Sequence, residues 1–247
     1  MKFNSVAIAQ PTFLPWSGYF DIADQVDLLI VLDDVSFSKQ SWQQRNRIRT
    51  PQGLSYLTVP VRTAGKLGQA ILATELADTQ FVTKITRTVA QNYARAPYFE
   101  RYFQDFSTVL AESAASGNLC ALNCGLIDWL AAHLGITTPR MRSSELGVSG
   151  KRGAHVAGLC ERVGATYYLS PPGAQEYLIE DRAEFAIRNI AVGFHVYEHP
   201  QYRQCFTPFV PYASTIDLLF NEGEAALEIL RSGRRTPQAL LVPTSEV

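Results

Sequence analysis

Two adjacent carboxylates, Asp33 and Asp34, directly follow the short apolar run Leu28 to Leu32. Carboxylates at the end of a buried strand can hold a metal through oxygen ligands or act as a general base. Arginine binds carboxylate or phosphate in two-point fashion, and an indole can stack on a sugar. Residues of these kinds follow closely: Lys39, Trp42, Arg45, Asn46 and Arg47. This segment is the leading site candidate, although a solvated turn with ion pairs is the structural alternative.

The turn that contains Gln10, Trp16 and Tyr19 is a second candidate. It joins an apolar strand to a helix, and the free N–H groups at a helix N-terminus suit phosphate or carboxylate. Nucleotidyltransferases place a similar turn at their nucleotide site, with two histidines where this chain has Trp16 and Tyr19. A connection stiffened by prolines explains the same residues in structural terms.

His199 is the candidate general base, because it leaves an apparent strand among polar neighbours and histidine titrates near neutral pH. Tyr202 and Gln204 follow it closely. Cys205 is a poor partner for a thiol mechanism, because neighbours on a strand point to opposite faces. A capping or packing role is expected for His133, near a helix end, and for His155, in a helix, and His195 lies inside a predicted strand.

A third candidate lies at the turn Ser170-Pro171-Pro172-Gly173, which follows another predicted strand, Thr166 to Leu169. Ser170 and Tyr177 are placed there to contact substrate. A plain turn accounts for these residues almost as well, and no metal site is predicted, because one Asp-Asp pair does not establish one.

The elements that must position these residues form an α/β pattern. Val6 to Ala9 and Leu28 to Leu32 are apolar throughout and are separated by a helix at about Tyr19 to Gln25. Strands buried on both faces belong to parallel sheets, whose ligands lie outside the carboxyl ends of the strands. We therefore predict a Rossmann-like, mostly parallel sheet with flanking helices and a helical subdomain.

The chain divides into four predicted parts. Residues 1–75 are the first α/β segment, 76–136 are a subdomain of three helices, and 137–235 complete the α/β domain. Ile216 to Leu230 is predicted as one helix within the third part. Residues 236–247 are expected to form a loosely attached tail.

Composition restricts the function classes. The 247 residues are 47% hydrophobic and carry a formal charge of −1, so no global field favours nucleic acid. The four cysteines have no metal-ligand spacing and are expected to be buried thiols. The N-terminal apolar run is too short for a signal peptide, and no membrane span is predicted. The expected location is the cytoplasm.

Five long stretches of this sequence resemble the WbqC-like protein family. They are QPTFLPWSGYF (10–20), LDDVSFSKQSWQQRNRI (32–48), TPQGLSYLTVPV (50–61), ATYYLSPPGAQEYL (165–178) and HPQYRQCFTPFVPYASTIDLLFNEG (199–223). The family pattern includes His-Pro-x-Tyr-x-Gln, matched by His199, Tyr202 and Gln204, but it does not include Cys205. The resemblance implies a role in bacterial surface-polysaccharide or other small-molecule biosynthesis, where some members are labelled acyl-group transferases.

Three functions are compared. The leading hypothesis is an acyl or aminoacyl transferase acting on an amino sugar or another small acceptor, with His199 as base and Asp33 and Asp34 orienting the acceptor. The second is a nucleotidyltransferase-like adenylating or nucleotide-binding enzyme. The third is a non-catalytic subunit of a biosynthetic complex. The expected partners are a small-molecule donor and acceptor, with a homodimer or a carrier protein left open, and the cofactor is unknown.

Overall fold

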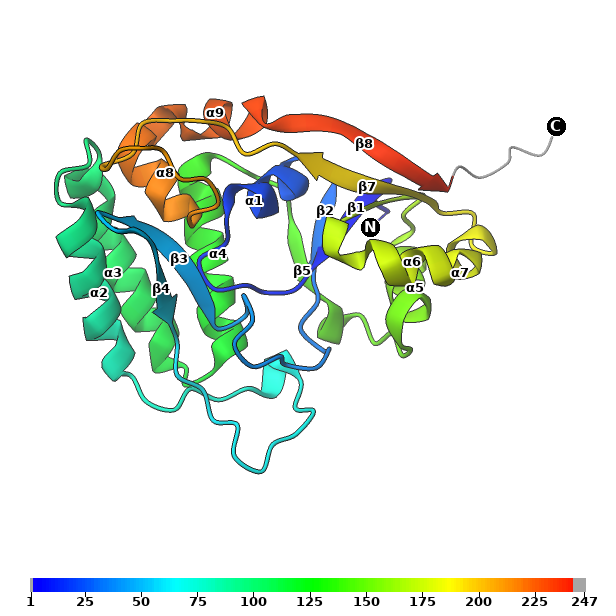
Figure 1. The fold of residues 1–247 in the computed structure, drawn as a ribbon. Helices are drawn as coiled ribbons and strands as arrows, with labels where there is room; N and C mark the ends of the chain where they lie inside the picture. The colour runs from blue at the N-terminus through cyan, green and yellow to red at the C-terminus, as the bar shows by residue number, and fades with distance from the viewer. Residues whose placement is uncertain (1, 242–247) are drawn as a thin grey trace.

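Six strands form a mostly parallel sheet in the order β5-β2-β1-β6-β7-β8 (Figure 1). The computed structural model describes residues 2–241. The strands are β1 (Ser5–Ala9), β2 (Leu28–Val31), β5 (Arg140–Arg142), β6 (Tyr167–Ser170), β7 (Ala191–Tyr197) and β8 (Arg234–Leu241). The first five run parallel to their neighbours, and β8 pairs antiparallel with β7. The predicted Rossmann-like α/β fold is therefore confirmed.

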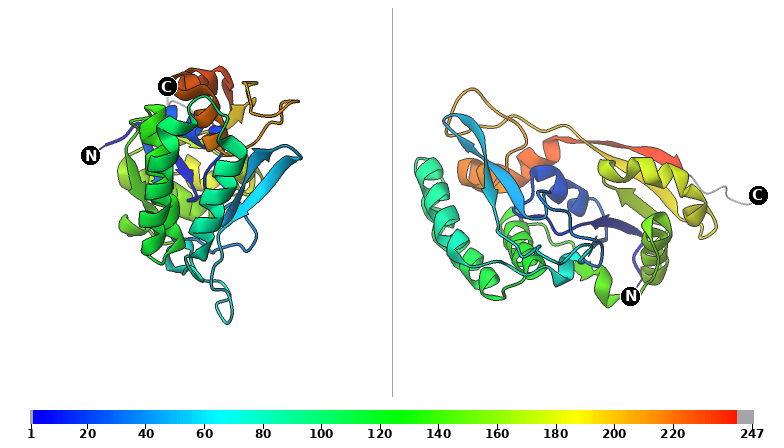
Figure 2. Two further views of the ribbon diagram at one scale, coloured as in Figure 1. Left: turned by 90° about the vertical axis from the view of Figure 1, so that its left-hand side faces the viewer. Right: turned by 60° about the horizontal axis from the view of Figure 1, so that its bottom comes forward.

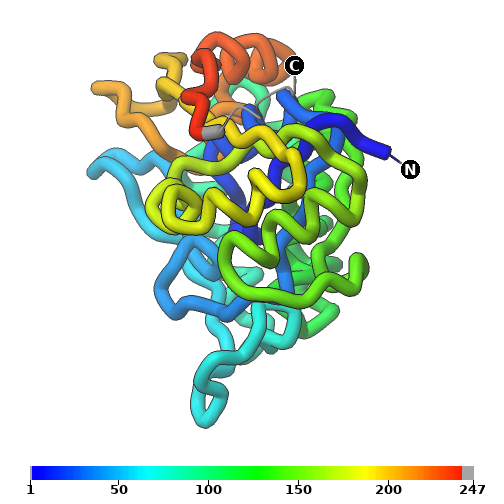
Figure 3. The backbone as a smooth tube through the Cα atoms, turned by 90° about the vertical axis from the view of Figure 1, so that its right-hand side faces the viewer, coloured from blue at the N-terminus to red at the C-terminus, as the bar shows by residue number. Residues whose placement is uncertain are grey.

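Helices cover both faces of this sheet (Figure 2). One face carries α5 (Arg152–Val163), α6 (Gln175–Glu180) and α7 (Arg182–Ala186), which lie toward the viewer in Figure 3. The other face carries α1 (Ser17–Asp24), α4 (Leu119–Leu134), α8 (Thr215–Glu222) and α9 (Ala226–Ser232). The sheet is thus the middle layer of three.

Alternate residues of the central strand serve the two layers. Ala7 and Ala9 pack into the core with α1 and α4, whereas Val6 and Ile8 pack into the core with α5. Successive strand side chains point to opposite faces, so a strand between two helical layers must be apolar at every position. This requirement explains the unbroken apolar run that precedes Gln10.

The three helices predicted between residues 79 and 134 are confirmed as α2 (Gln80–Tyr93), α3 (Phe99–Ala115) and α4. The buried residues of α2 are spaced four apart, as one helical face requires: Phe81, Ile85, Val89 and Tyr93. They share one continuous hydrophobic core with residues of the sheet. Figure 1 shows α2 and α3 at the end of the molecule opposite α5–α7.

A two-stranded hairpin, β3 (Arg45–Thr50) with β4 (Gly53–Thr58), packs against α2 and α8. Pro51 and Gln52 form its turn. Short 3-10 helices complete the fold: Ile71–Ala73, Ser143–Glu145, Pro172–Ala174 and Gly223–Ala225.

Two predictions near the C-terminus are wrong. The segment from Arg234 is not a loose end, because Arg234–Leu241 forms β8 on the edge of the sheet; residues 242–247 lie outside the described residues. The helix predicted from Ile216 to Leu230 is broken into α8 and α9 at Gly223. Gly223 has φ +55°, and a Cβ there would overlap the Tyr98 ring, so the chain turns where only glycine fits.

Candidate functional site

A cavity of about 440 Å³ opens at the carboxyl edge of the sheet. Its walls come from residues that follow strands, namely Gln10 after β1, Leu32 after β2 and Pro171–Ala174 after β6, together with the first turns of α1. This is the position where open α/β sheets bind their ligands. The cavity therefore lies at the edge of the sheet where the sequence predicts a ligand.

A second cavity, of about 290 Å³, adjoins the first. Four residues line both: Thr12, Trp16, Tyr19 and Trp42. The remaining walls of the second cavity are Asn46, Arg47 and Tyr212. Small-molecule sites have volumes of roughly 300–1,000 Å³; the first cavity lies within this range and the second is close to its lower limit. The shared wall makes the two cavities neighbouring halves of one cleft.

Trp16 and Gly18 shape the floor between the two halves. Trp16 precedes α1 in extended conformation, and a Cβ on Gly18 would overlap its indole. Glycine at position 18 therefore lets the indole lie directly on the first turn of the helix. The indole therefore covers the helix N-terminus at which the sequence predicts a possible phosphate or carboxylate site. In the nucleotidyltransferases the corresponding turn carries histidine.

Side-chain amides hold the loop after β1 against the segment that leads into β3. Asn46 Nδ2 donates to the carbonyls of Phe13 and Leu14 at 3.1 and 2.8 Å. Gln43 Nε2 donates to Gln10 Oε1 at 2.8 Å, and Phe13 N donates to the Trp42 carbonyl at 2.9 Å. These bonds fix Trp42 and Arg47 opposite Trp16.

Arg47 supplies a cation to the second cavity. Its guanidinium carbon lies 5.1 Å from the centre of the Trp42 ring, and Nη2 reaches the Tyr212 carbonyl at only 3.5 Å. Nε is buried without a hydrogen-bond partner, and within residues 2–241 no acidic side chain pairs with this arginine. An unpaired guanidinium in an aromatic pocket is suited to a carboxylate or a phosphate.

Asp33 is buried in a closed network. Its carboxylate accepts from Arg142 Nε at 2.6 Å, from Ser144 N at 3.0 Å and Oγ at 2.9 Å, and from Ser143 Oγ at 3.1 Å. Burial by itself raises the pKa of Asp33, but the hydrogen bonds from Ser144 and Arg142 outweigh it and lower that pKa. Asp33 thus fastens the residues after β5 to the end of β2.

Asp34 faces the same segment. It accepts from Ser143 Oγ at 2.6 Å and lies 3.2 Å from His155 Nε2, on α5. Neither Asp33 nor Asp34 lines either cavity. The structure therefore places both acids beside the cleft, in contact with protein groups.

His199 packs behind the wall of the second cavity, among five aromatic rings with centroids 5.3–6.4 Å from its own: Trp16, Tyr197, Tyr202, Phe209 and Tyr212. Burial lowers its pKa. Its contacts share no residue with those of Asp33 and Asp34 in the described chain, so the three predicted catalytic residues do not meet by direct contact.

The predicted binding residues fall into two groups, those that line the cleft and those that do not. Gln10, Trp16, Tyr19, Trp42, Asn46, Arg47 and Tyr177 line the cleft. Five more lie elsewhere: Lys39, Arg45, Ser170, Tyr202 and Gln204. Lys39 is exposed, Arg45 stacks on Tyr56 at 4.5 Å, and Ser170 Oγ bonds the Pro171 carbonyl. Tyr202 and Gln204 both donate to the buried Asp217, at 2.7 and 2.8 Å, and so have a structural contact.

Four lining residues that carry a polar group are not among the predicted site residues: Thr12, Tyr168, His195 and Tyr212. His195 is predicted to lie inside a strand and is not a candidate base in the sequence. The alternation of side chains along β7 places His195 on the other face of the sheet from Phe194. The sequence does not indicate which helix packs on that face. Its partner is Asp21 of α1, whose Oδ2 lies 2.7 Å from His195 Nε2.

Two features are absent from residues 2–241. No cluster of three or more His, Cys, Asp or Glu side chains is placed to hold a metal ion there. None of the helices in the same range is long and apolar enough to span a bilayer.

The fold and cleft define an α/β protein of Rossmann type with a small-molecule-sized site at the carboxyl edge of its sheet. Residues 10–229 match the WbqC-like protein family, and the chain belongs to that family. The uncharacterized protein Rv1507c of Mycobacterium tuberculosis (strain ATCC 25618 / H37Rv) is 35% identical over 233 residues, which are 94% of this chain and 100% of that relative. No solved structure matches the chain.

Proposed function

We propose that the protein is a small-molecule transferase that moves an acyl or aminoacyl group from an anionic donor to a small acceptor such as an amino sugar. The observation that carries this proposal is the pair of adjoining cavities with a shared wall. Two substrates held side by side react in an effectively unimolecular step. A protein that only binds one ligand has no need of the second compartment.

In this proposal the donor occupies the second cavity. Arg47 binds its carboxylate or phosphate, and the rings of Trp16, Trp42 and Tyr212 cover its apolar part. Because Arg47 has no acidic partner in the described chain, the donor would supply the missing counter-charge without displacing an existing ion pair. A charged hydrogen bond of this kind contributes about 1.5–3 kcal/mol.

The acceptor occupies the first cavity, where Gln10, Thr12 and Tyr177 offer polar groups among apolar walls. Its amine or hydroxyl attacks the donor carbonyl carbon, the new C–N or C–O bond forms, and the bond to the leaving group breaks. Asp33 and Asp34, which the sequence suggested as orienting groups, support the cleft from outside in this proposal. A role in surface-polysaccharide or other small-molecule biosynthesis is proposed from family membership.

The test is a transfer assay by mass spectrometry, with short acyl and aminoacyl coenzyme A thioesters as donors and glucosamine as acceptor. Arg47→Met keeps the stem over Trp42 and removes the cation, so we expect donor affinity to fall by roughly 10- to 150-fold. Lys39→Met is the matched control, because Lys39 is an exposed cation of the same segment outside both cavities. Equal effects of the two substitutions would contradict the proposal.

The second candidate is a nucleotide-binding enzyme, favoured by the position of the first cavity at the carboxyl edge of the parallel strands. It predicts thermal stabilisation by ATP or CTP with magnesium, of about 2.7 kcal/mol at a hundred times the dissociation constant. Acyl transfer predicts no magnesium requirement. Thermal shifts with each nucleotide, with and without magnesium, separate these two functions.

A further inference from the structure

His195 lies where a proton-transferring group of the cleft would have to be. It is on β7, is only 3% exposed, and lines the first cavity. Its ring packs beside Tyr197 at a centroid distance of 5.9 Å. Nε2 lies 2.7 Å from Asp21 Oδ2, and no group in residues 2–241 forms a hydrogen bond with Nδ1. One ring nitrogen is therefore held, and the other is the free nitrogen of a residue that lines the cavity.

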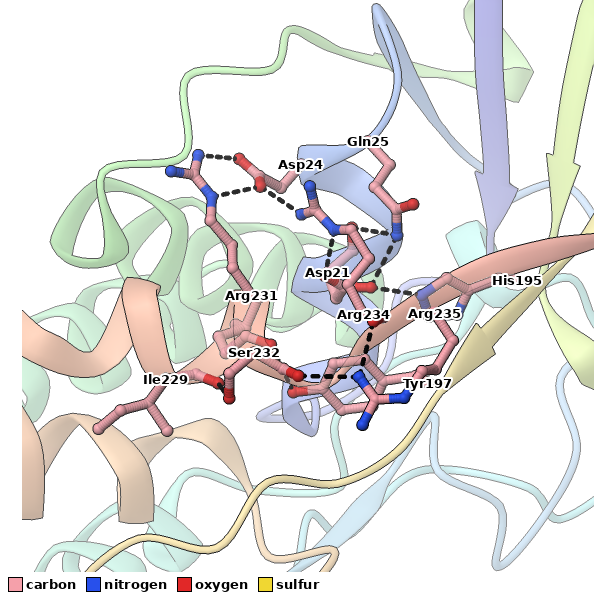
Figure 4. Close-up of polar contacts among 11 residues, drawn as sticks. Asp21, Asp24, Gln25, His195, Tyr197, Ile229, Arg231, Ser232, Arg234 and Arg235 are labelled. Atoms are coloured by element: carbon pink, nitrogen blue, oxygen red, sulfur yellow. Dashed lines mark hydrogen bonds and ion pairs between the residues drawn. The ribbon is translucent and has the colours of Figure 1, made fainter.

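Asp21 is fixed by three partners (Figure 4). It is fully buried, and besides His195 it accepts from Arg234 Nε at 2.9 Å and from Gln25 Nε2 at 2.7 Å. Arg234 comes from β8, the strand that the sequence did not predict, and its Nη2 also bonds Asp24 at 2.5 Å. The orientation of the carboxylate is thus set by α1 and β8 together.

This arrangement determines the tautomer of the imidazole. With an arginine on the same carboxylate, Asp21 acts only as an acceptor, so Nε2 must donate to it. The neutral ring then carries its proton on Nε2 and has a lone pair on Nδ1. A lone pair next to a substrate cavity, on a ring oriented by a buried carboxylate, is the arrangement of a general base.

A second histidine–aspartate pair in the chain provides the comparison. His133 Nε2 lies 2.8 Å from Asp105 Oδ2, which also accepts from Trp129 Nε1 at 2.7 Å. That pair joins α3 to α4, and His133 lines neither cavity. The two pairs share their chemistry but not their position, so His133 serves as a matched control for His195.

We propose that His195 is the catalytic base of the cleft and that Asp21 is its positioning residue. The inference rests on the proposed transferase function. Nδ1 takes the proton from the acceptor amine or hydroxyl as it bonds to the donor carbonyl carbon. The bond from that carbon to the leaving group breaks, the electron pair departs with the leaving group, and the proton passes from Nδ1 to it. His199, which lines neither cavity, has no part in this step.

The decisive variant is Asp21→Asn. Asparagine keeps an acceptor oxygen for Arg234 and places its NH₂ group against His195 Nε2, which must then accept; the Gln25 amide, which donates to the same oxygen of Asp21, must turn to present its own oxygen. The proton moves to Nδ1, and the base loses its lone pair in the cavity while the packing is retained. We expect kcat to fall by about 10²–10⁴-fold with little change in KM. His195→Gln should lose kcat similarly, and His133→Gln should leave it unchanged.

Nitrogen-15 spectra of labelled histidine test the inference without any substrate. The wild-type protein should show His195 protonated on Nε2, and Asp21→Asn should show it protonated on Nδ1. Diethyl pyrocarbonate should modify His195 in the wild type, through the cavity, and at least about tenfold more slowly in Asp21→Asn, because acylation needs a nitrogen lone pair.

The outcomes separate this inference from the proposed function. If Asp21→Asn inverts the tautomer of His195 but keeps kcat within about threefold of the wild type, His195 is not the catalytic base. If no donor and acceptor pair is converted, the transferase proposal fails. The basicity and accessibility of Nδ1 are then decided by the spectra and the modification rates, and equal rates in the wild type and Asp21→Asn would overturn the inference.

Discussion

Asp33→Asn tests whether the buried carboxylate fastens the fold or takes part in chemistry. The wild-type carboxylate accepts hydrogen bonds from Arg142, from Ser143 and twice from Ser144, and a long one from the Cys120 thiol at 3.9 Å. Asparagine has one acceptor oxygen and no charge, so the guanidinium loses its partner and an NH₂ group faces other donors. The substitution should therefore lower the free energy of unfolding.

The magnitude follows from burial. Removing one partner of a fully buried ion pair costs about 3–5 kcal/mol. Because the Arg142 side chain is 40% exposed, water replaces part of the interaction, and we expect about 2–3 kcal/mol. For a chain of this size that corresponds to a fall in Tm of about 4–12 °C. Asp34→Asn, which loses fewer contacts on a carboxylate with 21% exposure, should cost about 1 kcal/mol.

The pH dependence of stability provides an independent measurement. Hydrogen bonds lower the pKa of Asp33 in the folded state below its ordinary value of 3.8. The folded state then binds this proton less readily than the unfolded state. The stabilisation is complete above about pH 4 and is lost as the pH falls through the folded pKa. Asp33→Asn should remove that part of the acid sensitivity.

Urea unfolding followed by circular dichroism, at pH 7 and at several acidic pH values, measures both effects. A variant that unfolds at the wild-type midpoint but no longer binds donor or acceptor would refute the reasoning. That result would mean that Asp33 takes part in ligand binding and does not stabilise the fold.

Three further predictions concern the cleft and its surroundings. Gly18→Ala forces the Trp16 indole to move, which should destabilise the fold by about 1–3 kcal/mol and weaken ligand binding, as thermal shift and titration calorimetry would show; unchanged binding would contradict the packing. Tyr19→Phe removes a buried hydroxyl without a partner in the described chain, so stability should stay within about 1 kcal/mol of the wild type or rise; a larger loss in urea unfolding would mean that the hydroxyl is paired. Burial lowers the pKa of His199 below 6.5, so its stabilisation is complete above pH 6.5 and declines as the pH falls toward the folded pKa; His199→Gln should flatten this part of the stability curve, and an unchanged curve would contradict the assignment.

The edge of the sheet that holds the cleft was predictable because its signal is local. Runs apolar at every position, such as Val6 to Ala9, indicate strands covered on both faces, and ligands lie beyond the carboxyl ends of such strands. Gln10 and Tyr177 follow strands in this way and line the cavity. The same locality explains the success with α2, whose buried positions repeat every four residues.

The roles of individual polar residues depend on contacts with distant parts of the chain, so they could not be predicted from local sequence. Asp33 is followed by basic residues in sequence, yet its partners are Arg142, Ser143 and Ser144, about 110 positions later. His195 could not be recognised as a site residue because nothing in the strand indicates that α1 brings a carboxylate to it. β8 escaped prediction because an edge strand containing a proline has weak local preference and forms by pairing with β7.

A crystal structure with a donor analogue and glucosamine soaked together would test the central claim most directly. We expect the anionic group of the donor to contact Arg47 in the second cavity. We expect the acceptor amine to lie in the first cavity, within hydrogen-bond distance of His195 Nδ1. Both ligands bound in one cavity, or an acceptor amine placed against His199 and away from His195, would contradict this arrangement.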